Sequence, residues 1–594
     1  MTIAALSMLV PMAVACAMAG ASAFTDRHQG VVAVAGAVAA LGLTIALLAR
    51  QDTRLLVWFG GWEPRKGVAV GVGFAIDGLG AGLAAFVGAL GVVSLVLAAR
   101  LIRVEGATFH ALMLVFVAAM IGFCLTGDLF NLFVFFELMS VSAYVLVGYE
   151  VRRRAALEGA LTFAVTNTVG SILLLLGVTL LYGRTGALNL AQIGRTLTEQ
   201  PADGLVVVAF ALIACGLFVK AAVVPFHMWT ADAYAVAPTP VCILLAGAFS
   251  ELGLYGIARV YWTVFDGPLG AHADALRAIL VVAGVLTGLL GAVLCAAQHH
   301  LKRMLAYATI AQVGLFLVGL GLLSADGLAG SAVWVVADGL VKAALFGCVA
   351  IVQDRCGDIE ERDLHGRARD LRPLGVVFVL GALIIASLPL NGSFLGRALV
   401  EDAALKAPGY AWVPTVLLVV TGLVGGTLLR AAARVFWGAG AVAPRDPAGE
   451  PEEEETGDRE GSASLLWIAP VVMIVAAVAW GLVPGLAGAA GRAAAAFVDS
   501  HGYAAGVLDG RTLPVHAPEI PAPGLTAYLY AAGSLALAGA VAAVALARVP
   551  ALPAPLGRAV DALRRIHSGR PGDYVAWTVG GAATLGGVFA LTLL

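Results

Sequence analysis

Long apolar segments recur along the whole chain, and this repetition restricts the possible folds more than any other feature. Of the 594 residues, 60% are hydrophobic and 12% are charged, which is more apolar sequence than a water-soluble core can bury. A segment of about twenty apolar residues crosses a bilayer as a helix. We therefore expect an all-α polytopic membrane protein with about sixteen transmembrane helices, at residues 3–23, 31–49, 74–99, 110–127, 128–148, 159–182, 204–225, 240–264, 277–297, 304–324, 331–352, 372–405 (broken), 411–437, 464–488, 524–547 and 573–594.

Basic residues are distributed unevenly between the loops. Alternate loops, beginning with the first, hold most of the arginines and lysines, and the other loops hold few. The positive-inside rule then places the Arg-rich loops in the cytoplasm and both termini outside a cell inner (plasma) membrane. Met1, Thr2 and Ile3 provide no basic n-region for a signal peptide, so we expect the first apolar segment to remain as an uncleaved helix.

Charge and cysteine content exclude several functional classes. The net charge of −2 gives no reason to expect nucleic-acid binding. The seven cysteines show no CxxC spacing, and no pair of histidines has metal or haem spacing within a span. The sequence also has no nucleotide, flavin or iron–sulfur motif. We therefore expect no cofactor, metal, redox centre or catalytic residue on this chain.

The pattern of apolar and charged segments divides the chain into five parts. The segment around Glu452–Glu455 is acidic, contains Pro and Gly and has no apolar face, which is typical of a disordered loop. Residues 556–567 carry apolar and basic side chains on opposite helical faces, which predicts a short interfacial helix. The five parts are N-terminal transmembrane helices at 1–100, a first repeat at 101–265, a second repeat at 266–440, an acidic cytoplasmic loop at 441–463, and C-terminal helices with the interfacial helix at 464–594.

Two apolar segments are interrupted by residues that break helices. Lys220 ends one apolar run shortly before Pro225, and Pro389 and Asn391 interrupt another. A lysine in hydrocarbon costs several kcal/mol, and a proline leaves backbone groups without helical partners. Both are tolerated where a helix lines a polar interior. Because interrupted segments in corresponding halves indicate ion sites, we expect two inverted five-helix repeats, each with a broken helix.

Four motifs, in this order, resemble one known family of membrane subunits. They are GDLFNLFVFFELMSVSAYVLVGYE (127–150), LFVKAAVVPFHMWTADAYAVAPTPV (217–241), HLKRMLAYATIAQVG (300–314) and DGLVKAALF (338–346). The family comprises antiporter-like membrane subunits of respiratory complex I, of Mrp-type multisubunit cation/proton antiporters and of membrane-bound hydrogenases. The branch that contains the D-type Mrp subunits and the hydrogenase subunits is the most similar. The resemblance covers more than half of the chain.

The resemblance implies which residues translocate ions. The family's glutamate on the fifth helix matches Glu137, and its lysine on the broken seventh helix matches Lys220. In the family, a proton enters a half-channel, resides on a central lysine and leaves when a neighbouring charge pair opens or closes. Further charged positions of the family match Lys302, Lys342, Arg397 and, in the third helix, Asp77.

Three positions depart from the family pattern. Glu251 stands where the family usually has lysine, Asp338 stands where many relatives have histidine, and Arg397 replaces a lysine. Arginine does not release a proton in the working pH range. A buried Glu251 needs a cation partner, for which the candidates are Lys220, Arg259, Lys342 and Arg397.

Two interpretations of Glu251 stay open, as do two for the histidine after Pro225. Glu251 either carries a proton in an altered relay or forms a static pair that interrupts transfer between the halves. His227 either carries protons near the channel mouth or has a capping or hydrogen-bonding role at the helix break.

These observations lead to two hypotheses of function. The first is a proton- or cation/proton-translocating subunit of an Mrp-type, complex I-like or hydrogenase-like complex, whose partners are other membrane subunits, the lipid bilayer and protons or Na⁺. The second is a membrane partner that transports nothing itself and supports another protein, such as an inorganic-carbon uptake component. The residues at 251, 338 and 397 favour the second hypothesis, whereas Glu137 and Lys220 favour the first.

Overall fold

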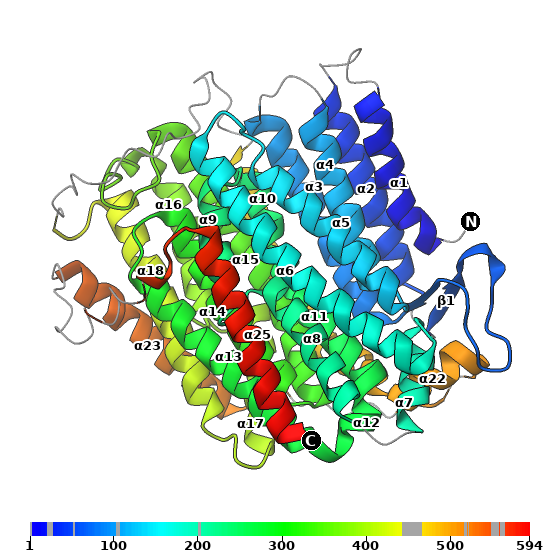
Figure 1. Cartoon of the computed structure of the whole chain (residues 1–594). Coiled ribbons are helices and arrows are strands. Elements are labelled where there is room, and N and C mark those ends of the chain that lie inside the picture. The colour runs from blue at the N-terminus through cyan, green and yellow to red at the C-terminus, as the bar shows by residue number, and fades with distance from the viewer. Residues whose placement is uncertain are drawn as a thin grey trace.

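Apolar helices make up nearly all of the fold (Figure 1). The computed structural model describes residues 3–20, 28–50, 54–102, 107–199, 203–441, 466–511, 513–515, 520, 522–547, 558, 563, 565, 566 and 567–593. Within these residues, 13 helices are long and apolar enough to cross a membrane, or up to 14 if one bent pair counts as a span. The expected polytopic helical membrane protein is confirmed, but the expected number of spans is not.

The difference in number has two local causes. Residues 239–296 form a helical stretch of 58 residues where the sequence predicts two separate spans. The broken segment near residue 390 forms two helices that are each too short to count. The long helices are α1 (Ile3–Gly20), α2 (Gln29–Leu48), α3 (Gly78–Leu101), α4 (Thr108–Leu125), α5 (Leu129–Val147), α6 (Arg154–Thr185), α8 (Gly204–Ala221), α13 (Ala273–Ala296), α14 (Leu301–Gly321), α15 (Ala325–Cys356), α18 (Val413–Trp437), α23 (Leu525–Ala547) and α25 (Pro571–Leu593).

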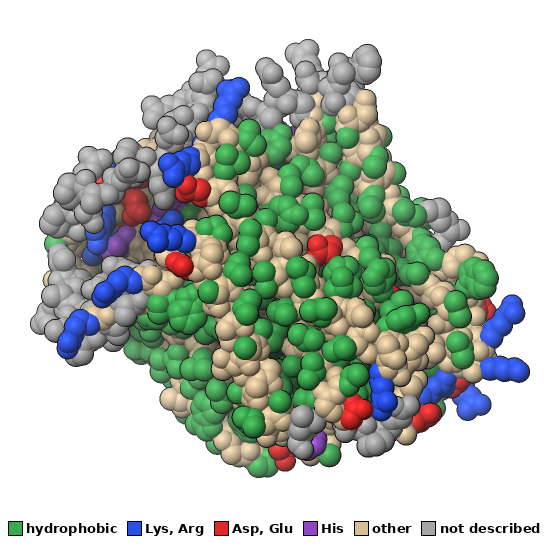
Figure 2. All heavy atoms as spheres, viewed as in Figure 1, with side chains coloured by type: hydrophobic (Ala, Val, Ile, Leu, Met, Phe, Trp, Pro, Cys, Tyr) green, Lys and Arg blue, Asp and Glu red, His purple; other side chains and the backbone are tan. Residues whose placement is uncertain are grey.

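The surface agrees with burial in a bilayer. Figure 2 shows a broad band of apolar side chains, with most of the charged groups gathered at the edges of the molecule. Exposed valines and leucines on the outer helices, such as Val38, Leu161 and Leu176, would be costly in water and are favourable against lipid. This distribution places the polar interior between the helices and not on their outer faces.

The first break in a helix follows Lys220 directly. The backbone at Ala222 is left-handed, with φ of 59°, and the chain continues as an irregular turn before α9 (Met228–Val236). The indole Nε1 of Trp229 donates a hydrogen bond of 3.0 Å to the carbonyl of Val219. Side chains thus satisfy backbone groups that the break leaves without helical partners.

The second break lies between α16 (Arg372–Ile385) and α17 (Gly392–Lys406). Ser387 and Leu390 have left-handed backbones, with φ of 73° and 65°. The side-chain oxygen of Asn391 accepts hydrogen bonds from the first backbone amides of α17, as an N-cap residue does. Both segments that the sequence predicts to be broken are therefore broken, and the inverted relation of the two halves stays a prediction.

A close contact between two glycines brings the two halves together. Gly247 lies in η2, a π-helical turn, and Gly339 lies in α15. A Cβ atom at Gly339 would stand 2.6 Å from the carbonyl oxygen of Gly247, so only glycine permits this approach. Glu251 follows the π-helical turn and Asp338 precedes Gly339, and the contact therefore places both acids in the same interior region.

The helical stretch that contains Glu251 consists of α10 (Thr239–Leu244), η2 (Leu245–Phe249), α11 (Ser250–Val260), η3 (Tyr261–Phe265), α12 (Asp266–Leu269) and η4 (Gly270–His272).

A small antiparallel hairpin is the one sheet among the described residues. Strand β1 (Leu55–Trp58) pairs with β2 (Gly73–Ile76), and Leu55 lies opposite Ile76. These strands are not among the elements expected from the sequence. Figure 1 shows the hairpin at one end of the bundle, on the side of the short helices. The short helices outside the spans are η1 (Phe59–Gly61), α7 (Leu190–Thr198), α22 (Ser500–Asp509) and η5 (Arg369–Leu371).

The C-terminal part differs in detail from the predicted spans. Helices α20 (Ile468–Leu482) and α21 (Leu486–Val498) meet at 79°, where the sequence predicts one span at 464–488. Nearly all of the acidic loop at 441–463 and most of the interfacial helix at 556–567 lie outside the described residues. The division of the chain into five parts stays a prediction.

A buried ionic cluster ties the loop after α15 to α18 and to the turn between α13 and α14. Glu361 is fully buried and binds Arg430 at 2.8 Å and Arg434 at 3.1 Å. His299 donates a hydrogen bond of 3.3 Å to the same carboxylate. Burial alone would raise the pKa of Glu361, but the bond from His299 and the two arginine charges outweigh burial and lower this pKa below its ordinary value.

The cluster predicts a pH-dependent loss of stability on the acid side. Glu361→Gln should destabilise the protein by about 3–5 kcal/mol near neutral pH, because it leaves two buried arginines without their carboxylate. Since the folded-state pKa is lowered, this contribution is complete above pH 4.5 and disappears as the pH falls below that value. Thermal unfolding of the purified protein between pH 7 and pH 3 measures the difference between wild type and variant.

Glu158→Gln is the matched control for this experiment, because Glu158 pairs with Arg154 at an exposed position. It should change stability by less than about 1 kcal/mol. A Glu361→Gln effect that stays constant down to pH 3 would contradict the assigned charge state.

Candidate functional site

Lys220 is fully buried at the end of α8, directly before the first helix break. Its ammonium group donates hydrogen bonds to the Ser140 hydroxyl and, at 3.4 Å, to the carbonyl of Phe136. The nitrogen also lies 4.1 Å from the ring centre of Phe136 and 4.0 Å from that of Phe249, which is cation–π geometry. Among the described residues, neutral groups therefore provide all the direct contacts of this charge.

Glu137 is close to Lys220 but makes no ion pair with it in the described part of the chain. Its charge acts on the ammonium through space, and its Oε1 atom has no hydrogen-bond partner there. The side chain is partly exposed. The predicted pair of Glu137 and Lys220 is thus a pair of neighbours and not a direct contact.

Glu251, Asp338 and Lys342 form a buried triad. The ammonium of Lys342 lies 3.1 Å from Oε1 of Glu251 and 2.6 Å from Oδ2 of Asp338. Each of the three side chains is at most 2% exposed. Asp338 and Lys342 lie one turn apart on α15, and the glycine contact with η2 brings Glu251 to them. Of the four cations considered as partners for Glu251, the structure selects Lys342.

Arg397 lies in the second broken segment and makes a neutral pair. Its Nε is 2.7 Å from Oε1 of Glu401, and its Nη1 donates to the Thr421 hydroxyl at 3.0 Å. Thr421 in turn shares a hydrogen bond of 2.8 Å with Ser534 of α23. Both charged partners are almost completely buried. Arg397 is thus paired within its own helix.

His227 contacts a histidine from the far end of the chain. Its Nε2 lies 3.1 Å from Nε2 of His567, which precedes α25. The Nδ1 of His567 lies 2.8 Å from the carbonyl of Leu563, and a carbonyl can only accept, so Nδ1 carries the hydrogen. In the neutral pair, His227 is therefore the donor to His567. Helix α25 packs against α6 and α8. A hydrogen bond of 2.8 Å from Tyr574 to Asp232 also joins α25 to α9.

Lys302 stands apart from the acids of the predicted pathway. It is buried, and its Nζ donates a hydrogen bond of 3.2 Å to the carbonyl of Ala237. Ala237 follows α9 directly and lies in the short turn before α10. The hydrogen bond from Lys302 stabilises this turn. A role of Lys302 in ion translocation stays a prediction.

Asp77 belongs to a second buried ion pair at the start of α3. Its Oδ2 lies 2.6 Å from Nη2 of Arg259, and its Oδ1 accepts the N-cap hydrogen bond from Gly80. The guanidinium also lies 3.9 Å from the ring centre of Phe497 in α21. The pair therefore joins α3, α11 and the C-terminal helices, and its residues lie far apart in the sequence.

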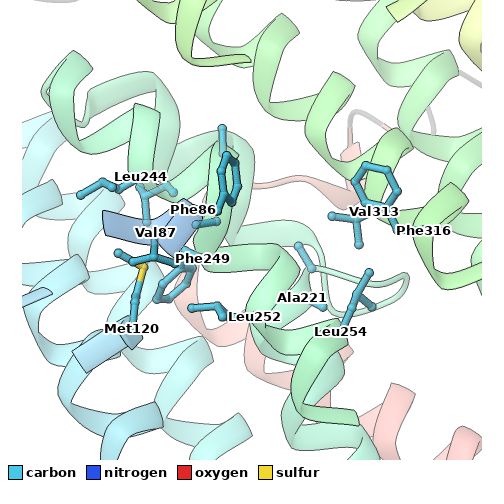
Figure 3. Packing of buried hydrophobic residues seen from close by; sticks show 14 of the residues in the cluster. Phe86, Val87, Met120, Ala221, Leu244, Phe249, Leu252, Leu254, Val313 and Phe316 are labelled. Atoms are coloured by element: carbon cyan, nitrogen blue, oxygen red, sulfur yellow. The ribbon is translucent and has the colours of Figure 1, made fainter. Parts of the chain in front are cut away.

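Apolar side chains lie against both buried ammonium groups. Figure 3 shows Phe249 with Leu252 in one group of buried side chains, and Val313 and Phe316 in another. The ring centre of Phe249 lies 4.0 Å from the ammonium of Lys220, and that of Phe316 lies 5.8 Å from the ammonium of Lys342. Each of the two lysines is thus next to an aromatic ring of the apolar core.

The sequence predicted the charged residues better than it predicted their partners. Ser140, His567 and Glu401 are partners in the structure. Glu401 had a signal in the sequence, through its spacing of four residues from Arg397. Ser140 also had a signal, because it lies one turn after Phe136 on α5, the helix of Glu137. His567 is 340 residues from His227, and no local pattern reports such a contact.

A family model described as NADH:quinone oxidoreductase/Mrp antiporter, TM, matches residues 126–424. The chain belongs to this family. Among the predicted site residues, Asp77 alone lies outside the range that matches the NADH:quinone oxidoreductase/Mrp antiporter family.

Individual proteins of this family are similar over most of their length. The chain is 33% identical over 400 residues to NADH-quinone oxidoreductase subunit N of Desulforudis audaxviator (strain MP104C), covering 66% of this chain and 77% of the relative. It is 31% identical over 372 residues to antiporter subunit mnhD2 of Staphylococcus saprophyticus, covering 62% and 71%. The solved structure of the Mrp complex from Dietzia sp. DQ12-45-1b matches with a TM-score of 0.72 and 26% identity, covering 86% of this chain and 100% of that chain.

The pair of Asp77 and Arg259 predicts a large loss of stability on neutralisation. Asp77→Asn should cost about 3–5 kcal/mol, because a buried guanidinium loses its counter-ion. Asp274→Asn is the control, since Asp274 pairs with Arg277 while 93% exposed, and it should cost less than about 1 kcal/mol. Thermal unfolding in detergent measures both, and equal effects of the two variants would contradict the structural assignment.

Proposed function

We propose that this chain is a proton- or cation/proton-translocating membrane subunit of a multisubunit complex. The observation that carries the proposal is Lys220, which is a buried ammonium at a helix break with neutral groups as its direct contacts in the described structure. Its family relatives are named as a subunit of NADH-quinone oxidoreductase and as an antiporter subunit.

The neighbourhood of Lys220 suits reversible proton binding. A carboxylate that approaches a lysine favours its charged form, and one that withdraws favours release of the proton. Glu137 acts on Lys220 through space and is not bonded to it, so a small movement of α5 would change the interaction strongly. The hydroxyl of Ser140 lies on the same helix and moves with it, so a rotation of the Glu137 side chain alone would change the interaction and leave the contact of Lys220 with Ser140 in place.

The position of Glu137 supports assembly with other membrane subunits. A carboxylate in the middle of a span is costly against lipid, yet Glu137 is partly exposed on α5. The same face of α5 exposes Phe130, Val134 and Val141. A neighbouring subunit that covers this face would remove both the carboxylate and the apolar side chains from lipid.

One observation favours the alternative of a membrane partner that transports nothing itself. The second broken segment holds Arg397 in a neutral pair with Glu401, and arginine does not release a proton in the working range. If only this half were considered, the chain would be a scaffold for another protein, such as a component of inorganic-carbon uptake. Lys220 and Glu137 in the first half favour transport.

The proposal predicts that Lys220→Ala strongly reduces proton translocation by the assembled complex. A positioned proton carrier typically contributes about 10²–10⁴-fold, so we expect a reduction of roughly 100-fold or to the background rate. Proton uptake into vesicles that contain the whole complex measures the effect. Lys406→Ala is the control, because Lys406 is exposed and pairs with Asp402 at the surface.

The yield of co-purified subunits in the same preparation measures whether the complex has assembled. A Lys220→Ala complex that assembles normally and translocates protons at the wild-type rate would refute the proposed function. A loss of translocation in Lys406→Ala as well would show that the effect is not specific to the pathway.

A further inference from the structure

The C-terminal segment lies directly against the first helix break. A Cβ atom at Gly581 of α25 would stand 2.4 Å from Cγ of Pro225, so the last helix touches the break itself. The residue His567, which precedes α25, contacts His227. All of α25 lies beyond residues 126–424, the range that matches the family model. The C-terminal segment therefore adds residues to the break that the family match does not include.

The hydrogen bonds of His567 determine which of its ring nitrogens accepts. Its Nδ1 lies 2.8 Å from the carbonyl of Leu563, which can only accept, so Nδ1 carries a hydrogen. In a neutral imidazole the other nitrogen is then an acceptor. The Nε2 atom of His567 therefore presents a lone pair to Nε2 of His227 at 3.1 Å. It follows that His227 supplies the hydrogen of this contact.

The second nitrogen of His227 also lies near an acceptor. The backbone carbonyl of Pro225 interacts with the His227 ring. Because Nε2 faces His567, the nitrogen on the side of this carbonyl is Nδ1. This atom is buried and has no well-aligned hydrogen bond among the described residues. In the neutral pair Nδ1 carries a lone pair, and this lone pair faces an oxygen that can only accept.

The two rings together have partners for three hydrogens on their four nitrogens. Two neutral imidazoles carry only two, and one added proton supplies the third. In that state Nδ1 of His567 donates to Leu563, and Nε2 of His227 donates to His567. The added proton on Nδ1 of His227 points to the carbonyl of Pro225. A fourth hydrogen would place N–H groups on both sides of the contact between the rings and would break it.

The surroundings of the pair favour a charge that both rings share. His227 is 2% exposed, and burial opposes a charge on this ring alone. His567 is partly exposed and can share the charge with it. The charged and titratable groups on the elements around the pair are Lys220 of α8, Asp232 of α9, Arg303 and Tyr307 of α14, Arg565 before α25, and Asp573 and Tyr574 within α25.

We propose that His227 and His567 form one proton-binding site, in which the two rings share a single added proton. The inference rests on the proposed transport function and assigns part of its proton path to the C-terminal segment. The proton comes from water and forms an N–H bond with the lone pair on Nδ1 of His227. The charge of the pair rises from 0 to +1, and no other bond forms or breaks. The contact between the rings persists because a charge-assisted hydrogen bond replaces a neutral one.

The first test observes both rings in the purified full chain and requires no transport. In ¹⁵N-histidine-labelled protein, the chemical shift of each ring nitrogen reports whether it carries a hydrogen. A coupling between two nitrogens reports the N–H···N bond that joins the rings. As the pH falls, we expect one Nδ1 signal to change from its unprotonated to its protonated position while the coupling between the Nε2 atoms remains. A chelator in the buffer prevents a metal ion from bridging the rings.

Single substitutions assign these signals to the pair. His227→Gln and His567→Gln should each abolish the coupling, because each removes one of the two nitrogens. His28→Gln is the matched control, since His28 is exposed before α2, and it should keep the coupling and the Nδ1 titration.

The second test separates a proton carrier from a simple attachment of α25. A positioned proton carrier contributes about 10²–10⁴-fold, so His567→Gln should lower proton flux in the whole complex by at least about tenfold. Tyr574→Phe removes the hydrogen bond between α25 and Asp232 but no proton-binding nitrogen. It should keep the wild-type flux.

Two results would overturn the inference. One is a wild-type protein without a coupled pair of Nε2 atoms, or one in which the coupling disappears as soon as the Nδ1 signal changes. The other is a His567→Gln complex whose flux equals that of Tyr574→Phe. The spectroscopic result does not depend on flux, so a failure of the proposed function in Lys220→Ala would be distinguished from a failure of this inference.

Discussion

A charge inside the bilayer has to be stabilised by the protein itself, because no bulk water is present. This constraint explains most of what surrounds the buried charges of this chain. Arg397 has a carboxylate of its own in Glu401. Lys220 has a hydroxyl, a carbonyl and two aromatic rings. The triad around Lys342 has one carboxylate more than it has cations.

These three solutions differ in how readily the charge can change. A neutral ion pair is disrupted by losing either partner, and it therefore suits a fixed structural position. An ammonium held by neutral groups can lose its proton without leaving a partner unpaired. A triad with one carboxylate in excess is neutral only when a proton or another cation accompanies it. The surroundings of Lys220 thus suit a change of protonation, whereas the second break resembles a fixed joint.

Sequence alone determined much of the fold and a smaller part of the site. Apolar segment length identified the helices, and proline with flanking polar residues identified both breaks, since these signals are local. The expected number of spans is not confirmed, because residues 239–296 form one continuous helical stretch and the second broken segment forms two short helices. Spacing and motif resemblance identified Lys220 and Glu251 as buried charges. The partner of Glu251 depends on the backbone contact of Gly247 with Gly339, which no pattern within either segment reveals.

One statement carries this account: protons pass Lys220, the buried ammonium at the first helix break. Proton flux across vesicles that contain the whole complex, compared between wild type and Lys220→Ala, tests this statement most directly. We predict a flux that is lower by roughly 100-fold in Lys220→Ala. A Lys220→Ala complex that assembles normally and keeps the wild-type flux would contradict the account.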